Sequence, residues 1–240
     1  MTKLDILVLA AHPDDAELGC GGTIAKHVAL GFKVGIVDLT QGELGTRGTP
    51  ETRQAEAAAA AKILNVAIRE NLRLADGFFQ NDQADQLKVI AAIRAYQPEI
   101  VLANAISDRH PDHGKGASLV GDACFLAGLA KVETTDVQGK RQAPWRPKAV
   151  YHFIQSNLLM PHFVVDVSEH WHRKMEAIRA YKTQFFDPSS QEPETFISQP
   201  GFLELIESRG KDFGYAIGAT YGEGFTVRRL PGVEDLFALK

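Results

Sequence analysis

Short apolar runs alternate along the chain with longer stretches in which apolar residues recur at helical spacing. The apolar runs predict six strands, at 4–10, 33–40, 68–74, 99–105, 148–155 and 162–168. The helical stretches predict helices at 22–31, 50–64, 83–96, 116–130, 168–183 and 201–209. This alternation indicates an α/β fold of the Rossmann-like type, with a mostly parallel sheet covered by helices on both faces.

Short right-handed crossovers predict the strand order 3-2-1-4-5 for such a sheet. The point where the order reverses then lies between the first and fourth strands, and ligands bind there, outside the carboxyl ends of the strands. We expect one domain over residues 1–240, with a core at about 1–183. The remainder, about 184–240, is expected to be a C-terminal extension that covers the site.

Two clusters of histidine and aspartate follow the two strands that flank this reversal point. The first strand runs into "AAHPDDAELGCGG", which holds His12, Asp14 and Asp15. The fourth runs into "SDRHPDH", which holds His110 and His113. An isolated aspartate there would be a helix cap, but one cap does not need this many ionisable groups.

Two imidazoles and a carboxylate are the ligands that a catalytic zinc ion takes, with a fourth position kept for water. His12 and His113 can therefore hold zinc together with one of the two adjacent aspartates. The other aspartate is then placed to accept the proton of the water, and His110 to stabilise an oxyanion or protonate a leaving amine. Spacing alone does not decide which aspartate has which role.

The glycines of "ELGCGG" raise the alternative of a dinucleotide-binding loop, with Asp38 at the end of the second strand as the ribose-binding acid. The fingerprint G-x-G-x-x-G needs a third glycine, and that position is Ile24. The acidic residues of the loop would also repel a pyrophosphate. We therefore interpret the glycines as allowing close packing of helix on sheet.

Composition narrows the range of partners. The chain has 240 residues and a net charge of −4, without any block of Lys or Arg, so no nucleic-acid partner is expected. The run 4–10 is too short to span a membrane and is not followed by a cleavage site, so no membrane partner is expected. Two cysteines, Cys20 and Cys124, make no disulfide framework, which favours a cytoplasmic location.

The motifs "AHPDDAELGCGG" and "HPDH", with "GELGTRGTPETRQAEA" and the late "YGEGF", resemble the LmbE-like, or PIG-L, family of zinc-dependent sugar N-deacetylases. The resemblance implies one Zn²⁺ per chain held by His12, Asp15 and His113. It further implies that Asp14 is the general base and that His110 stabilises the tetrahedral intermediate. Iron or cobalt can occupy the same kind of site. Small members of the family tend to be homo-oligomers.

Within the family, "DLTQGELGTRGTPETR" is most similar to the bacillithiol-pathway enzymes that deacetylate N-acetylglucosaminyl malate. Arg53 matches an arginine implicated in substrate binding there. Arginine pairs with carboxylates in a bidentate fork, so Arg47, Arg53 and Arg109 are candidates to bind the two carboxylates of malate.

We therefore expect a small-molecule GlcNAc conjugate as the substrate. Alternatives in the same class are deacetylation of a chitooligosaccharide or a GlcNAc-inositol conjugate, and amide cleavage of a thiol-sugar conjugate. A different class would be a non-catalytic sugar- or nucleotide-binding module, which has no need of a base such as Asp14 and should not contain stoichiometric zinc.

Overall fold

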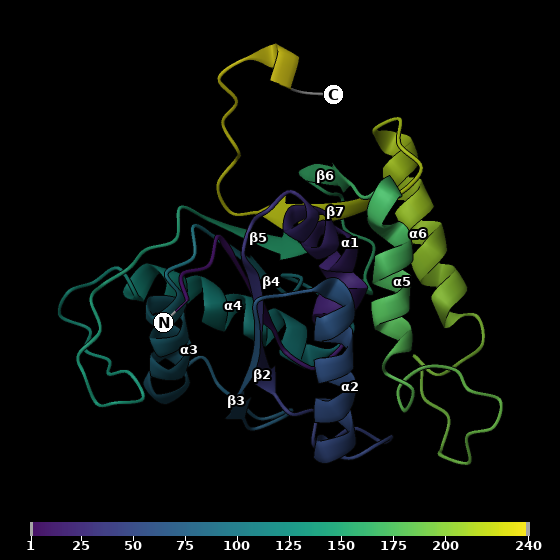
Figure 1. Cartoon of the computed structure of the whole chain (residues 1–240), viewed down its shortest axis with the longest axis horizontal. Helices are drawn as coiled ribbons and strands as arrows, with labels where there is room; N and C mark the ends of the chain where they lie inside the picture. Colours follow the sequence, from purple (N-terminus) through teal and green to yellow (C-terminus); the bar gives the residue numbers. More distant parts are fainter. Residues whose placement is uncertain (1, 239–240) are drawn as a thin grey trace.

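The computed structural model describes residues 2–238 of the chain (Figure 1). In chain order the elements are β1 (Ile6–Ala10), α1 (Asp15–Ala29), β2 (Val34–Thr40), α2 (Pro50–Leu64), β3 (Ile68–Leu74), α3 (Gln83–Tyr96), β4 (Ile100–Ala103), α4 (Pro111–Leu126), β5 (Ala149–Phe153), β6 (Phe163–Asp166), the 3₁₀ helix η1 (Ser168–His170), α5 (Trp171–Arg179), α6 (Phe202–Ala216), β7 (Gly222–Val227) and the 3₁₀ helix η2 (Leu236–Ala238).

Within residues 2–238 the strands form one sheet in the order β3-β2-β1-β4-β5-β7-β6. The first five strands are parallel and have the order 3-2-1-4-5, which confirms that prediction and the reversal point between β1 and β4. β7 is antiparallel to both β5 and β6. It was not predicted as a strand, because its glycine-rich sequence "GEGFTV" lacks a long apolar run. The sheet therefore continues beyond residue 183 and takes one strand from the C-terminal extension.

Side chains of β1 alternate between two hydrophobic cores, one on each face of the sheet. Ile6 and Val8 belong to the core formed with α1, α2 and α5. Leu7 and Leu9 belong to the core formed with α3 and α4. Figure 1 shows these two sets of helices on opposite sides of the strands. Burial on both faces explains why β1 is a continuous apolar run rather than an alternating one.

Two helices begin earlier than predicted, and both corrections concern the candidate site. α1 starts at Asp15 rather than at residue 22, so the second aspartate lies in its first turn. α4 starts at Pro111 rather than near residue 116, because Nδ1 of His110 caps it by accepting the N–H of Asp112 at 3.3 Å. Proline is favoured at the first helical position, where its missing N–H costs nothing. His113 is therefore held on a helix and not on a loop.

α1 is broken at Cys20, where the backbone leaves helical geometry at φ −145°. A buried ion pair supplies the hydrogen bonds that the break removes. The carboxylate of Glu223, on β7, accepts the N–H of Gly22 at 2.9 Å and that of Thr23 at 2.6 Å. Lys174, on α5, donates to the carbonyl oxygen of Leu18 at 2.7 Å and to Glu223 at 2.6 Å. The break explains why "GCGG" did not look helical in the sequence.

The remaining helices differ from prediction mainly in their ends. α2 and α3 have the predicted bounds, whereas the predicted helix 168–183 is divided into η1 and a shorter α5. α6 extends to Ala216, beyond the predicted 209. Residues 186–201, between α5 and α6, form neither helix nor strand, and we call this segment the strap. In the part of the chain that the structure describes, no helix has the length and hydrophobicity needed to cross a bilayer.

Candidate active site

The two histidine–aspartate clusters meet at the carboxyl ends of β1 and β4, as the strand order predicts. β1 and β4 are paired neighbours, with Leu9 opposite Ala103. Beyond the strand ends the two connections are tied together, because the N–H of Ala11 donates to the side-chain oxygen of Asn104 at 2.7 Å. The first turns of α1 and α4 thus face one another across the reversal point.

Asp15 lies between His12 and His113. Its Oδ2 is 3.3 Å from Nδ1 of His12, and its Oδ1 is 3.2 Å from Nε2 of His113. All three residues are buried, at 8% exposed or less. In a tetrahedral zinc site with bonds of about 2.0–2.1 Å, neighbouring ligand atoms lie about 3.4 Å apart. The two distances therefore suit a small dication placed between these atoms.

In both His12 and His113, the ring nitrogen that faces away from Asp15 lies next to a carboxylate. Nε2 of His12 lies 3.0 Å from Asp76 and 3.4 Å from Asp112. Nδ1 of His113 lies 2.6 Å from Asp108. Histidines that ligate metals almost always have such a partner, which fixes the ring and selects the nitrogen that faces the metal. The arrangement leaves Nδ1 of His12 and Nε2 of His113 pointing at Asp15.

The electrostatics of this cluster favour a cation. Burial lowers the pKa of His113, but the carboxylates of Asp15 and Asp108 raise it overall to about 9. Burial likewise lowers the pKa of His12, and its three carboxylate partners raise it well above the usual range. Each imidazole is thus held among more negative charge than it can neutralise. A dication would replace the bound protons and satisfy the same carboxylates.

Asp15 is further held by two amides that the sequence analysis did not identify. Its Oδ2 accepts from Nδ2 of Asn104 at 3.0 Å, and its Oδ1 accepts from Nε2 of Gln155. Burial raises the pKa of Asp15, but the two imidazoles outweigh burial and hold it well below the usual range. Asn104 follows β4 and Gln155 follows β5. The sequence did not predict the role of Asn104 or Gln155, because a single amide side chain forms no recognisable motif.

Asp14 has a different environment from Asp15. Its backbone is in the left-handed region at φ 112°, which is costly for a residue other than glycine and is found where function requires a strained turn. The side chain is 4% exposed and lies 3.3 Å from Nη2 of Arg53. Burial raises the pKa of Asp14 to about 7, against the opposing charge of Arg53. A carboxyl group with that pKa can both accept and release a proton at neutral pH.

His110 presents a hydrogen-bond donor to the site. Its Nδ1 accepts the N–H of Asp112, so in the neutral ring the proton is on Nε2. Burial, together with the neighbouring histidines, lowers the pKa of His110, which keeps the ring neutral at pH 7. The ring lies edge-on to that of His12, with 4.6 Å between centroids.

These groups line a cavity of about 490 Å³. All eight residues predicted from the sequence reach it: His12, Asp14, Asp15, Arg47, Arg53, Arg109, His110 and His113. The strap supplies part of the wall through Thr195, Phe196 and Ile197, in the region expected to cover the site. Asp76, after β3, also lines the cavity, although the sequence analysis assigned it no role.

The three arginines are not equivalent. Nη2 of Arg53 donates to the carbonyl oxygen of Pro13 at 2.6 Å, and Nη1 donates to that of Gly42 at 3.3 Å. Arg53 therefore supports the Asp14 turn through its two Nη groups, and among residues 2–238 its buried Nε has no hydrogen-bond partner. Arg109 is exposed and stacks on Phe196, with 4.4 Å from the guanidinium carbon to the ring centroid. Arg47 is buried against the strap.

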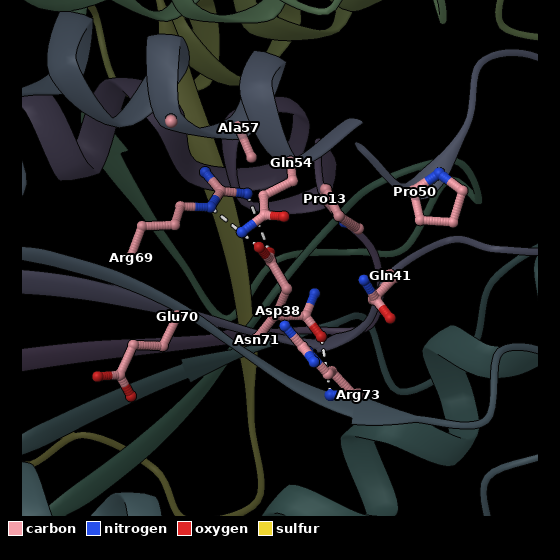
Figure 2. A pocket seen from close by; sticks show the side chains of 11 residues that line it. Pro13, Asp38, Gln41, Pro50, Gln54, Ala57, Arg69, Glu70, Asn71 and Arg73 are labelled. Carbon is pink, nitrogen blue, oxygen red and sulfur yellow. Dashed lines mark hydrogen bonds and ion pairs between the residues drawn. The ribbon is translucent and has the colours of Figure 1, made fainter. Parts of the chain in front are cut away.

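A second, smaller cavity of about 190 Å³ lies between α2 and the ends of β2 and β3. Figure 2 shows Arg69 and Asp38 directed toward one another in this cavity. Arg69 binds both carboxylate oxygens of Asp38, at 3.0 and 2.9 Å, and also binds Glu17. Both oxygens of Asp38 are already bonded to protein, so Asp38 is not a free ribose-binding acid.

Among residues 2–238, two clusters of side chains can hold a metal ion. One consists of His12, His110 and His113, and the other of His12, Asp76 and Asp112. Both include His12, so the structure offers a single metal region. Asp15 belongs to neither cluster, but it lies in the same region, between Nδ1 of His12 and Nε2 of His113.

Both histidine–aspartate clusters lie in a segment that matches a known protein family. The family model described as PIG-L, GlcNAc-PI de-N-acetylase, matches residues 7–124, which include both clusters. The crystal structure of a conserved protein from Thermus thermophilus is 34% identical and superposes with a TM-score of 0.86, covering 97% of this chain and 98% of that one. The chain belongs to the PIG-L family.

Two curated proteins show the range of chemistry among the relatives of this PIG-L member. A diacetylchitobiose deacetylase from Thermococcus kodakarensis is 28% identical over 95% of this chain and 84% of its own length. A 4-oxalmesaconate hydratase from Pseudomonas putida is 25% identical over 74% of this chain and 73% of its own length.

Proposed function

We propose that this PIG-L family member is a metal-dependent hydrolase that removes the acetyl group from an N-acetylglucosamine conjugate. The observation that carries the proposal is the placement of Asp15 between Nδ1 of His12 and Nε2 of His113, with Asp14 buried beside them. This combines a three-ligand metal site with a group whose pKa suits proton transfer at neutral pH. The matching family model and the deacetylase from Thermococcus kodakarensis support the same reaction class.

His12, Asp15 and His113 would hold one Zn²⁺ per chain. When bound, zinc polarises the acetamide carbonyl and lowers the pKa of water to about 7. The donor set of two nitrogens and one carboxylate fits zinc and also accepts iron or cobalt. Asp76, Asp112 and Asp108 would orient the two histidines from behind.

Asp14 and His110 would handle the proton and the developing charge. Asp14 accepts a proton from the attacking water as its oxygen bonds to the acetamide carbon. The Nε2–H of neutral His110 donates to the carbonyl oxygen, where negative charge accumulates. The carbon–nitrogen bond then breaks, and the proton held by Asp14 passes to the leaving nitrogen. The products are acetate and the free amine of a glucosamine conjugate.

We propose N-acetylglucosaminyl L-malate, the substrate in bacillithiol biosynthesis, as the conjugate. Arg47 and Arg109 support this choice, because both line the cavity and retain guanidinium donors that can bind carboxylates. Neutral substrates such as a chitooligosaccharide or a GlcNAc-inositol conjugate are the alternatives. Arg53, whose Nη2 donates to Pro13 and lies against Asp14, serves the Asp14 turn in this scheme.

The test is amine release from N-acetylglucosaminyl malate, N-acetylglucosamine and diacetylchitobiose, with and without a chelator. Preference for the malate conjugate that the chelator abolishes would support the full proposal. Chelator-sensitive release from the neutral sugars alone would retain the reaction and refute the malate substrate. Metal-loaded protein that releases no amine from any of them would refute the deacetylase assignment. Absence of bound metal would favour a non-catalytic sugar- or nucleotide-binding module.

A further inference from the structure

The strap binds Arg47, one of the arginines that line the cavity, and places the carboxylate of Glu192 next to it. Residues 186–201 cross from α5 to α6 without helix or strand and supply three cavity-lining residues. The strap contacts the loop after β2 at Arg47 and Gly48. It contacts the loop after β4 through the stacking of Arg109 on Phe196. The residues of the strap therefore lie next to two of the three arginines that line the cavity, Arg47 and Arg109.

Arg47 is a buried cation that is not fully satisfied. Its side chain is 5% exposed, and Nη2 donates to the hydroxyl of Ser190 at 2.7 Å. Its Nε is buried, and no residue from 2 to 238 accepts a hydrogen bond from it. A buried guanidinium donor without an acceptor is costly, so this edge of Arg47 is suited to a ligand that brings an acceptor oxygen.

Glu192 lies next to Nε of Arg47 but does not accept a hydrogen bond from it. One carboxylate oxygen accepts the N–H of Gly48 at 2.8 Å, and the other lies 3.6 Å from Nε of Arg47, beyond hydrogen-bond distance. The Glu192 side chain is 40% exposed, in contrast to the buried Arg47. It can therefore turn into solvent at little cost, whereas the arginine cannot.

We propose that Arg47 forms a carboxylate-binding subsite of the cavity and that Glu192 is a built-in competitor for it. A ligand carboxylate reaches Nε of Arg47 only by displacing or approaching the charge of Glu192. Glu192 thus sets the preference between anionic and neutral substrates, because a like charge beside a subsite discriminates against the anionic ligand. This proposal concerns the substrate preference of the proposed deacetylase, and it rests on that proposed function only where enzyme activity is measured.

The experiment compares the wild type with Glu192→Gln and with the matched control Glu194→Gln. Glutamine at 192 keeps an oxygen for the N–H of Gly48 and removes only the charge. Glu194 is an exposed strap residue bound to Gln199 at 3.2 Å, so its substitution removes the same charge elsewhere on the strap. The measurements are kcat and KM for N-acetylglucosaminyl malate and for diacetylchitobiose, together with inhibition of the neutral reaction by L-malate.

Glu192→Gln should lower the KM for the malate conjugate about fivefold relative to the KM for diacetylchitobiose, because the negative charge that opposes the malate carboxylates is removed. The effect is modest because Glu192 is partly exposed and its charge is screened by water. The inhibition constant of L-malate should fall by a similar factor, with both kcat values unchanged and Glu194→Gln without effect. Equal shifts in the two variants would refute a specific role, as would a KM change of equal size for both substrates. A weaker affinity for L-malate in Glu192→Gln would show that Glu192 supports Arg47 and would overturn the proposal.

The result stays distinguishable from a failure of the proposed function. If the wild type acts only on neutral sugars, L-malate inhibition still tests the subsite. If it releases no amine at all, L-malate binding measured by calorimetry to the three metal-loaded proteins gives the same comparison.

Discussion

The buried pair of Lys174 and Glu223 should be among the largest single contributions to stability outside the hydrophobic cores. Both residues are 3% exposed. Glu223→Gln would leave the Lys174 ammonium buried without a counter-charge, and one of the N–H groups of Gly22 and Thr23 without an acceptor. Breaking a buried pair from one side costs about 3–5 kcal/mol, and each unsatisfied N–H costs about 1–3 kcal/mol. Together these costs predict that the free energy of unfolding falls by at least about 4 kcal/mol, a large part of the usual range of about 5–15 kcal/mol.

The assay is equilibrium unfolding in urea with a chelator present, so that metal binding does not add to the stability of the folded state. The double variant Lys174→Met, Glu223→Gln should be more stable than Glu223→Gln alone, because no unpaired charge then remains buried. Glu99→Gln, which breaks a surface ion pair with Lys148, is the matched control and should leave unfolding almost unchanged. A loss below about 1 kcal/mol in Glu223→Gln, or a double variant less stable than that single variant, would refute this account.

Three further predictions concern the site and its surroundings. Asp14→Asn should retain metal, measured by elemental analysis, but lose about 10²–10⁴-fold in kcat, the usual contribution of a positioned base; loss of the metal as well would contradict its assignment as a base. Asp108→Asn should weaken metal affinity about 10–100-fold in chelator competition, because Nδ1 of His113 then faces a neutral amide in place of a carboxylate. Unchanged affinity would show that the charge of Asp108 does not support His113. Burial raises the pKa of Asp38 to about 6 in the folded state, compared with about 3.9 in the unfolded chain. The proton on Asp38 therefore stabilises the folded state fully below about pH 4, and this stabilisation is lost as the pH rises through about 6. The unfolding free energy of the wild type minus that of Asp38→Asn should therefore decrease between about pH 4 and pH 6, and an increase would show that Arg69 outweighs burial.

The structure adds a second role to one residue that is expected to bind substrate. The resemblance implies that Arg53 binds substrate, and its guanidinium also donates to Pro13 and Gly42 and lies against Asp14. Local sequence could not show this, because the partners are backbone carbonyls from two other loops. Because Arg53 also lines the cavity, its role in substrate binding stays a prediction.

The parts of the site that the sequence did not assign are those that stand behind the ligands. Asp76 follows β3 and lies 64 residues from His12 along the chain, yet the fold brings the two side chains within hydrogen-bond distance. Gln155 follows β5 and lies 140 residues from Asp15, to which it donates. Each acts through one carboxylate or one amide, so none leaves a repeating pattern.

By itself the sequence determined the alternation of strands and helices, the order of the five parallel strands and the meeting of the two histidine clusters. These follow from hydrophobic periodicity and chain connectivity, which are properties of neighbouring residues. Only the tertiary structure decided which nitrogen of each histidine faces Asp15, how Asp14 is buried beside it and where β7 enters the sheet. Those outcomes depend on contacts between segments distant along the chain, and burial at such contacts sets the protonation and orientation on which the chemistry depends.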